Sequence, residues 1–252
     1  MKHALVSVLA ACSIPDVNLA GKPCPCATGY VCDSATSTCV TSLGGSDAAR
    51  GGSDAGTDSS VAASCLAAPL TTPLYSTTFP DLSGWAIGGG TWAATDNQAV
   101  QSDAGNGLAY AYHPSSTQLT DQRVVSHFQM ISGGDGRALE LAVRVQGGVS
   151  AGQYHCNWEP TDGAFLIMYT QTATMTGQLA MTNIDLRLIP SYSPFDPVTM
   201  ELQVRGSRLD CCLREIPAAS LTAMDTQFTS GSPGMKTYEE SGSYDYVDVY
   251  GP

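Results

Sequence analysis

The chain has 252 residues, a formal net charge of -12 at pH 7 and only 13% charged residues. A surface of this sign repels phosphate backbones and anionic headgroups, so nucleic acid binding is not expected. The 26 glycines and the absence of an extended helical pattern favour an exported β protein, as one large domain or two smaller ones.

The first residues predict an export signal. A short basic start precedes an apolar run too short to span a bilayer, which is typical of a signal peptide over residues 1–11. The run Leu-Ala-Ala before Cys12 resembles the lipobox of bacterial lipoproteins. That resemblance implies that Cys12 carries a lipid, that this lipid alone attaches the protein to a membrane, and that Ser13 directs it to the outer membrane or cell surface. Ordinary secretion, with Cys12 in a discarded leader, is the alternative.

Residues 12–40 predict a small cysteine-rich module. The chain has nine cysteines, an odd number, so a lipid on Cys12 leaves eight for disulfides in an oxidising compartment. Four of them lie in a segment too short to bury a core: Cys24, Cys26, Cys32 and Cys39. A zinc site is the alternative, but no Cys-x-x-Cys pair is present. The segment resembles the short modules that follow lipoboxes in some bacterial surface proteins.

Composition changes twice after this module. Residues 41–63 contain Gly, Ser, Asp, Ala and Thr without an aromatic residue, which predicts a flexible linker. Alternating apolar and polar residues bounded by turn signals then predict one β domain over residues 64–252. We expect strands at 74–79, 91–94, 99–102, 109–112, 123–131, 137–146, 153–159, 164–170, 185–189 and 244–250. Many short strands without helices between them predict an antiparallel sandwich or jelly roll.

Residues 200–213 predict a β-hairpin around an Arg-Gly-Ser-Arg turn. Side chains alternate between the two faces of a strand, so Cys211 should point inward and Cys212 outward. Cys156 shares a face with Tyr154 and Trp158. We therefore expect a Cys156–Cys211 disulfide, and a Cys65–Cys212 disulfide that ties the linker to the domain.

The segment from Phe79 to Val100 resembles the opening of concanavalin A-like, or LamG-like, jelly rolls. It reads Phe-Pro-Asp-Leu-Ser-Gly-Trp, then a glycine-rich bend before Trp92, and the end of the chain resembles their two closing strands. The resemblance covers roughly residues 79–252 and implies an all-β jelly-roll sandwich. Because this fold carries lectins, glycan-degrading enzymes and receptor modules, it implies no particular activity. The tryptophans Trp85, Trp92 and Trp158 are expected to pack in the core or hairpins.

Sequence motifs for catalysis are missing. The Glu-x-Asp-x-x-Glu strand of jelly-roll glucanases and the Gly-x-Ser-x-Gly motif of serine hydrolases are both absent, so no catalytic residue is assigned and no cofactor or metal is expected. The acidic residues of the closing hairpin are expected to form a solvated edge: Glu239, Glu240, Asp245 and Asp248. The histidines His113, His127 and His155 show no triad or metal spacing and are expected to be exposed on strands.

Polar residues on the wet faces of the central strands predict a binding surface. On a concave sheet they would line one groove and could exchange hydrogen bonds with sugar hydroxyls. They are Arg123, His127, Gln129, Glu140, Arg144, His155, Asn157 and Glu159. The alternative is the ordinary solvated face of an antiparallel sheet. We therefore predict non-catalytic binding of a glycan or cell-envelope polysaccharide, or surface display. The alternative function is a divergent glycan-active hydrolase with carboxylates from separate strands.

Overall fold

The computed structural model describes residues 31–33, 38–40, 63–105, 109–113, 118–133, 137–147, 152–172 and 175–252. The chain divides into two compact units, Met1–Ser59 and Ser60–Pro252. In the first, β1 (Val31–Asp33) and β2 (Thr38–Val40) pair antiparallel, with Cys32 opposite Cys39. The predicted signal peptide, Cys12, Cys24, Cys26 and residues 41–62 of the predicted linker lie outside the described residues.

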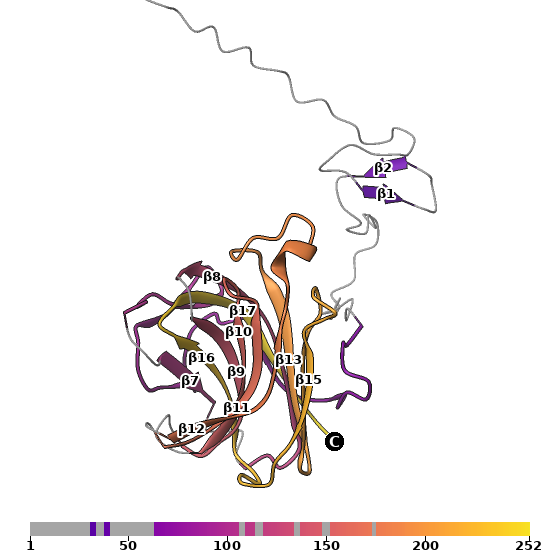
Figure 1. Cartoon of the computed structure of the whole chain (residues 1–252). Helices are drawn as coiled ribbons and strands as arrows, with labels where there is room; N and C mark the ends of the chain where they lie inside the picture. Colours follow the sequence, from indigo (N-terminus) through magenta and orange to yellow (C-terminus); the bar gives the residue numbers. More distant parts are fainter. Residues whose placement is uncertain are drawn as a thin grey trace, which may run out of the picture. The chain divides into compact units, whose positions relative to one another are not determined.

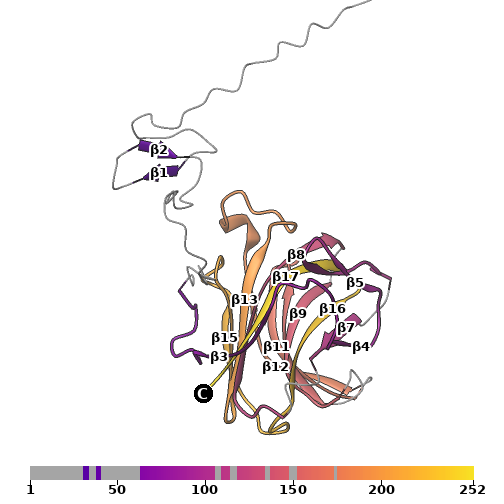
Figure 2. The ribbon, with the colours of Figure 1, turned by 180° about the vertical axis from the view of Figure 1, so that it is seen from behind.

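The unit Ser60–Pro252 is an antiparallel β-sandwich, whose two sheets lie as separate layers in Figures 1 and 2. The first sheet has seven strands in the order β12-β11-β10-β9-β16-β7-β4. Their bounds are β4 (Ala86–Ile87), β7 (Ala109–Tyr112), β9 (Ala138–Val145), β10 (Gln153–Glu159), β11 (Ala164–Thr172), β12 (Met175–Asn183) and β16 (Ser232–Tyr238).

The second sheet has eight strands in the order β15-β14-β13-β8-β17-β6-β5, with β3 also paired to β17. Its long central strands β8 and β17 are neighbours although they lie far apart in the sequence, as expected for a jelly roll. The bounds are β3 (Thr72–Thr77), β5 (Trp92–Thr95), β6 (Gln98–Gln101), β8 (Gln122–Ser132), β13 (Val198–Arg205), β14 (Arg208–Leu213), β15 (Ser220–Met224) and β17 (Ser241–Gly251).

The core lies between the sheets. The period of two in side-chain direction sends Leu141 and Trp158 inward from the seven-stranded sheet, and Met200 and Val249 inward from the eight-stranded one. The three tryptophans belong to this core or pack against it, as predicted. Apolar burial between the layers is therefore the main term that holds the sandwich together.

The 200–213 hairpin forms in the predicted register, with Met200 opposite Leu213 and Arg205 opposite Arg208. Its turn contains Gly206 at φ 56°, a left-handed conformation that glycine adopts without strain. Both predicted disulfides of the domain are present: Cys156–Cys211 joins the two sheets through the core, and Cys65–Cys212 ties residue 65 to the outer face of β14.

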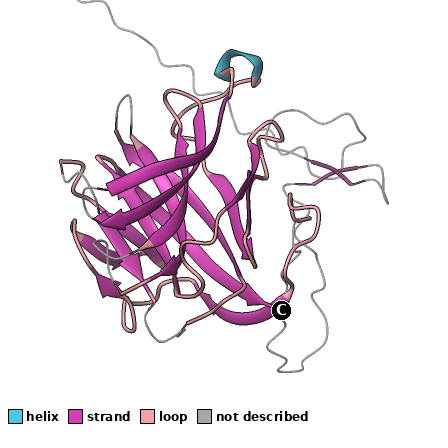
Figure 3. Cartoon of the chain, turned by 60° about the horizontal axis from the view of Figure 1, so that its bottom comes forward, coloured by secondary structure: helices cyan, strands magenta, loops and turns pink. Residues whose placement is uncertain are grey.

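Four elements differ from the sequence-based expectations. Residues 185–189 form a 3-10 turn, Leu186–Leu188, because the Asp185 carboxylate accepts a hydrogen bond from the Arg187 backbone N–H; Figure 3 shows it as the one helical element of the described residues. Strands β4, β12 and β15 were not anticipated, since all three are edge strands with largely exposed or half-buried side chains. Within the described residues, no helix has the length and apolarity that crossing a bilayer requires.

Candidate functional site

Five polar side chains gather on the outer face of the seven-stranded sheet, and we call them the polar cluster. They come from four adjacent strands: Glu140, His155, Asn157, Thr170 and Lys236. Their direction follows from the core, since inward Leu139 and Leu141 turn the residue between them outward. Strand register then aligns Lys236, Glu140 and Asn157 in one row across β16, β9 and β10.

Glu140 is the centre of the polar cluster. Its Oε2 atom lies 2.6 Å from Lys236 Nζ and 2.6 Å from His155 Nδ1. His155 Nδ1 also lies 2.8 Å from Asn157 Oδ1 and 3.2 Å from Lys236 Nζ, and its Nε2 lies 3.0 Å from Thr170 Oγ1. The neutral tautomer with a proton on Nδ1 fits this arrangement, because Nδ1–H then donates to Asn157 Oδ1 while Nε2 accepts from the Thr170 hydroxyl.

Burial and pairing decide which of these groups are charged. Burial alone would raise the pKa of Glu140, but the Lys236 charge and the hydrogen bonds with His155 and Lys236 outweigh it and lower the pKa to about 2. Burial, and next the Lys236 charge, lower the pKa of His155. At neutral pH the cluster therefore holds one ion pair, Glu140 with Lys236, beside a neutral imidazole.

The cluster has an aromatic and acidic border. Tyr110 and Tyr112 of β7 point to the same face, opposite Lys236 and Gly234, and their rings lie parallel with centroids 6.3 Å apart. Glu159 of β10 is half-buried, and burial together with the charges of Asp162 and Glu140 raises its pKa. The five side chains of the polar cluster are themselves buried. This face thus offers two ring surfaces beside the half-buried Glu159 carboxyl, a combination suited to sugar rings and hydroxyls.

The eight predicted binding residues do not share one groove. Glu140, His155, Asn157 and Glu159 lie on the seven-stranded sheet, but the first three are buried, whereas the prediction placed them on a solvated face. Arg123, His127 and Gln129 belong to β8, whose outer face is on the opposite side of the sandwich. Alternation does not show which strands are neighbours, so the prediction placed residues from the outer faces of two different sheets in one groove.

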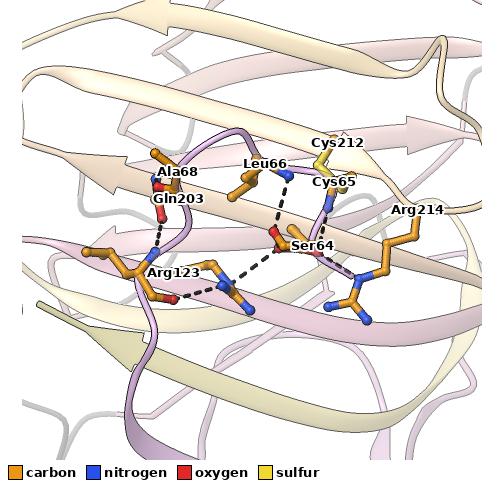
Figure 4. Close-up of polar contacts among 10 residues, drawn as sticks. Ser64, Cys65, Leu66, Ala68, Arg123, Gln203, Cys212 and Arg214 are labelled. Atoms are coloured by element: carbon orange, nitrogen blue, oxygen red, sulfur yellow. Dashed lines mark hydrogen bonds and ion pairs between the residues drawn. A yellow bond between two sulfur atoms is a disulfide. The ribbon is translucent and has the colours of Figure 1, made fainter. Parts of the chain in front are cut away.

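Arg123 has a structural role in the eight-stranded sheet. The segment of residues 64–70, which we call the strap, crosses the outer face of that sheet (Figure 4). Arg123 donates to the Leu70 carbonyl at 2.8 Å and lies 3.4 Å from buried Glu201. Glu201 in turn accepts from Ser64 Oγ at 2.7 Å, so these buried charges hold the strap rather than face solvent.

The remaining predicted residues are engaged elsewhere. His127 pairs with Asp245 at a partly exposed position, and Gln129 donates to the Phe195 carbonyl. Arg144 has a positive φ of 53° and donates to the carbonyls of Thr120, Phe228 and Gly206, so its guanidinium joins loops at one end of the sandwich. These contacts leave none of the three beside the polar cluster.

Two expectations of exposure are wrong. Glu240, predicted on a solvated edge, is 0% exposed, and burial raises its pKa to about 8. His113 and His155 are buried, and only His127 is partly exposed. Glu240, His113 and His155 were predicted to be exposed because of their place in the alternation or beside a turn. Alternation does not show where another segment of the chain covers an outward-facing side chain.

Sequence reasoning missed Lys236 and the tyrosines. Signals for them exist: Lys236 is the one lysine beyond residue 22, and Tyr110 and Tyr112 alternate with small alanines on a predicted strand. None of the described residues form a group of three or more His, Cys, Asp or Glu side chains suited to a metal ion.

The architecture defines this domain as a jelly-roll sandwich of the galectin-like type. The carbohydrate-binding module CBM66 from Bacillus subtilis is similar in structure, with a TM-score of 0.53 and 19% identity over 66% of this chain and 95% of the module. A Bacillus subtilis protein of unknown function with a galectin-like fold has a TM-score of 0.55 and 14% identity over 72% and 97% of the two chains. No protein-family model and no curated protein sequence matches the chain. At these identities, the likeness is one of fold.

Proposed function

We propose that the domain binds carbohydrate on the outer face of the seven-stranded sheet, without catalysis. The observation that carries this proposal is the polar cluster beside the parallel pair Tyr110 and Tyr112, in a fold similar to that of a carbohydrate-binding module. The tyrosines would stack on sugar rings, while half-buried Glu159 would exchange hydrogen bonds with hydroxyls. Glu140, His155 and Lys236 would hold those groups in position.

Non-catalytic binding is favoured over hydrolysis by the state of the carboxylates. Glu140 is nearly inaccessible and paired with Lys236, so it is a poor nucleophile or base for a bound glycan. A hydrolase of this fold class would need two accessible carboxylates flanking a glycosidic bond. The alternative function stays an outcome of the test below.

The test uses a glycan array and a reducing-sugar assay on the full chain. We expect retention of at least one glycan without release of reducing ends. Tyr112→Ala should weaken that binding about fivefold or more, because a stacked ring contributes about 1 kcal/mol or more. Tyr250→Ala removes a ring from the outer face of the other sheet and should leave binding unchanged. Turnover would favour the hydrolase, and an equal effect of both variants would contradict this location of the site.

We further propose that the protein is attached to the outer membrane or cell surface through a lipid on Cys12. The cysteine count supports this: with Cys65–Cys212 and Cys156–Cys211 formed, Cys24, Cys26, Cys32 and Cys39 can make two more bonds in the 12–40 module, and Cys12 is left over. Disulfides also favour an oxidising compartment outside the cytoplasm. Mass spectrometry of the N-terminal peptide tests the lipid, and Cys12→Ser should abolish membrane association if the proposal is right.

A further inference from the structure

A groove lies beside the strap on the outer face of the eight-stranded sheet. It has a volume of about 440 Å³, within the range of small-ligand sites, and residues 65–68 of the strap form one wall. The other wall comes from outward side chains at the β13, β14 and β15 end of the sheet: Arg205, Arg208, Asp210, Ser220 and Thr222. The Cys65–Cys212 disulfide and the strap contacts in Figure 4 keep the two walls together.

The charges in this groove are unbalanced. Arg205 and Arg208 lie directly opposite each other in the hairpin, and like charges in that position destabilise a sheet unless they are compensated. Asp210 compensates Arg208, with its carboxylate 2.8–3.0 Å from the guanidinium nitrogens. Arg205 is exposed and makes no hydrogen bond or ion pair within the described part of the chain, and its charge acts on Asp210 only as one of the smaller causes that lower the pKa of that carboxyl.

The strap interactions do not satisfy Arg205. Glu201, the carboxylate of β13 that holds the strap, is already bound by Arg123, Arg214, Ser64 and the Cys65 backbone. Gln203 is likewise taken by the backbone of Leu70 and Ala68. The free guanidinium therefore faces a groove whose own acidic group, Asp210, is committed to Arg208 and to the Thr222 hydroxyl.

We propose that this groove is a second binding site, and that it takes a carboxylated sugar such as a uronic acid. Arg205 would bind the carboxylate through two parallel hydrogen bonds, which a guanidinium fork makes readily. The exposed Ser220 hydroxyl, in the same wall, would contact a ring hydroxyl. The ligand supplies a second negative charge beside Arg205 and Arg208, which have only Asp210 between them. The site is on the other sheet from the polar cluster, so it stands or falls independently of the proposed function.

The experiment is a calorimetric titration of the full chain with galacturonate, and with galactose as the neutral counterpart. We expect galacturonate to bind and galactose not to bind. Arg205→Gln should weaken galacturonate binding at least tenfold, without lowering the thermal midpoint of the unliganded protein. Arg187→Gln is the matched control, because Arg187 is also exposed but pairs with Asp185 in the 3-10 turn; it should leave binding unchanged.

Four results with the wild type and Arg205→Gln would overturn the proposal. They are no binding of galacturonate, equal binding of galactose, an unchanged affinity in Arg205→Gln, and displacement of galacturonate by an equal concentration of inorganic sulfate, which would indicate a general anion site. Tyr112→Ala separates the two sites. If that variant abolishes galacturonate binding, the sugar acid binds at the polar cluster and the groove is not its site.

Discussion

The ion pair between Glu140 and Lys236 gives the sharpest prediction about the candidate site. The two side chains are each 2% exposed, with Lys236 Nζ 2.6 Å from Glu140 Oε2. Lys236→Met removes the positive charge while keeping a chain of similar length, so Glu140 is left as a buried charge without its main partner. Breaking a buried pair on one side costs about 3–5 kcal/mol of unfolding free energy.

The pKa of Glu140 leads to a similar figure and fixes the sign of the pH dependence. The folded pKa of about 2 lies below the ordinary 4.5, so the ionised carboxylate stabilises the fold above pH 4.5, by about 3 kcal/mol, and this is lost as the pH falls through 2. Without Lys236, burial dominates and raises the pKa of Glu140. In the variant, Glu140 is then protonated at mildly acidic pH, which removes the cost of a buried unpaired charge. The difference in unfolding free energy between wild type and Lys236→Met should therefore narrow from pH 7 to pH 4.

Urea denaturation followed by tryptophan fluorescence measures these differences, since Trp158 lies in the core. Lys236→Met with Glu140→Gln should cost less than Lys236→Met alone, because the double variant leaves no buried charge. Arg187→Met breaks the exposed Arg187–Asp185 pair and should have no measurable effect. The reasoning fails if Lys236→Met costs less than about 1 kcal/mol at pH 7, or if the loss of unfolding free energy in the double variant equals the sum of the losses in Lys236→Met and Glu140→Gln.

Three further predictions concern other parts of the domain. The Cys156–Cys211 disulfide closes a loop of 55 residues and contributes about 4 kcal/mol, and the Cys65–Cys212 disulfide closes a loop of 147 residues and contributes about 5 kcal/mol. Serine in place of Cys211 also leaves a hydroxyl in the apolar core, which costs about 1–3 kcal/mol more. Cys211→Ser should therefore destabilise the domain more than Cys212→Ser in urea, and the reverse order would contradict this. Burial raises the pKa of Glu240 to about 8, so the protonated carboxyl contributes up to about 5 kcal/mol of unfolding free energy; this contribution is complete below pH 4.5 and is lost as the pH rises through 8. Glu240→Gln should therefore flatten the dependence of stability on pH between pH 5 and 9, and an unchanged slope would refute the assignment. Gly88→Ala would place a methyl group against the Tyr110 ring, so it should lower the thermal midpoint and weaken glycan binding together; a change in neither would mean that the ring is mobile.

Much of the fold could be predicted from local pattern. Alternation set the faces of the 200–213 hairpin, and inward Cys211 and outward Cys212 then led to both disulfides of the domain. Alternation also put Glu140, His155 and Asn157 outward on neighbouring strands. It could not show that β8 pairs with β17 and β13, far away in sequence, rather than with β9. For that reason Arg123 and His127 were grouped with residues of the other sheet.

The sequence by itself determined the all-β class and the inward or outward direction of the residues in the strands that it predicted, and its cysteines predicted an oxidising compartment. Those properties depend on near neighbours in the chain and on a side-chain period of two. Only the tertiary structure decided that Lys236 meets Glu140, that the strap covers Arg123 and that Glu240 is buried. Each of these depends on which distant segments lie side by side, and burial, charge state and ligand access follow from that long-range pairing.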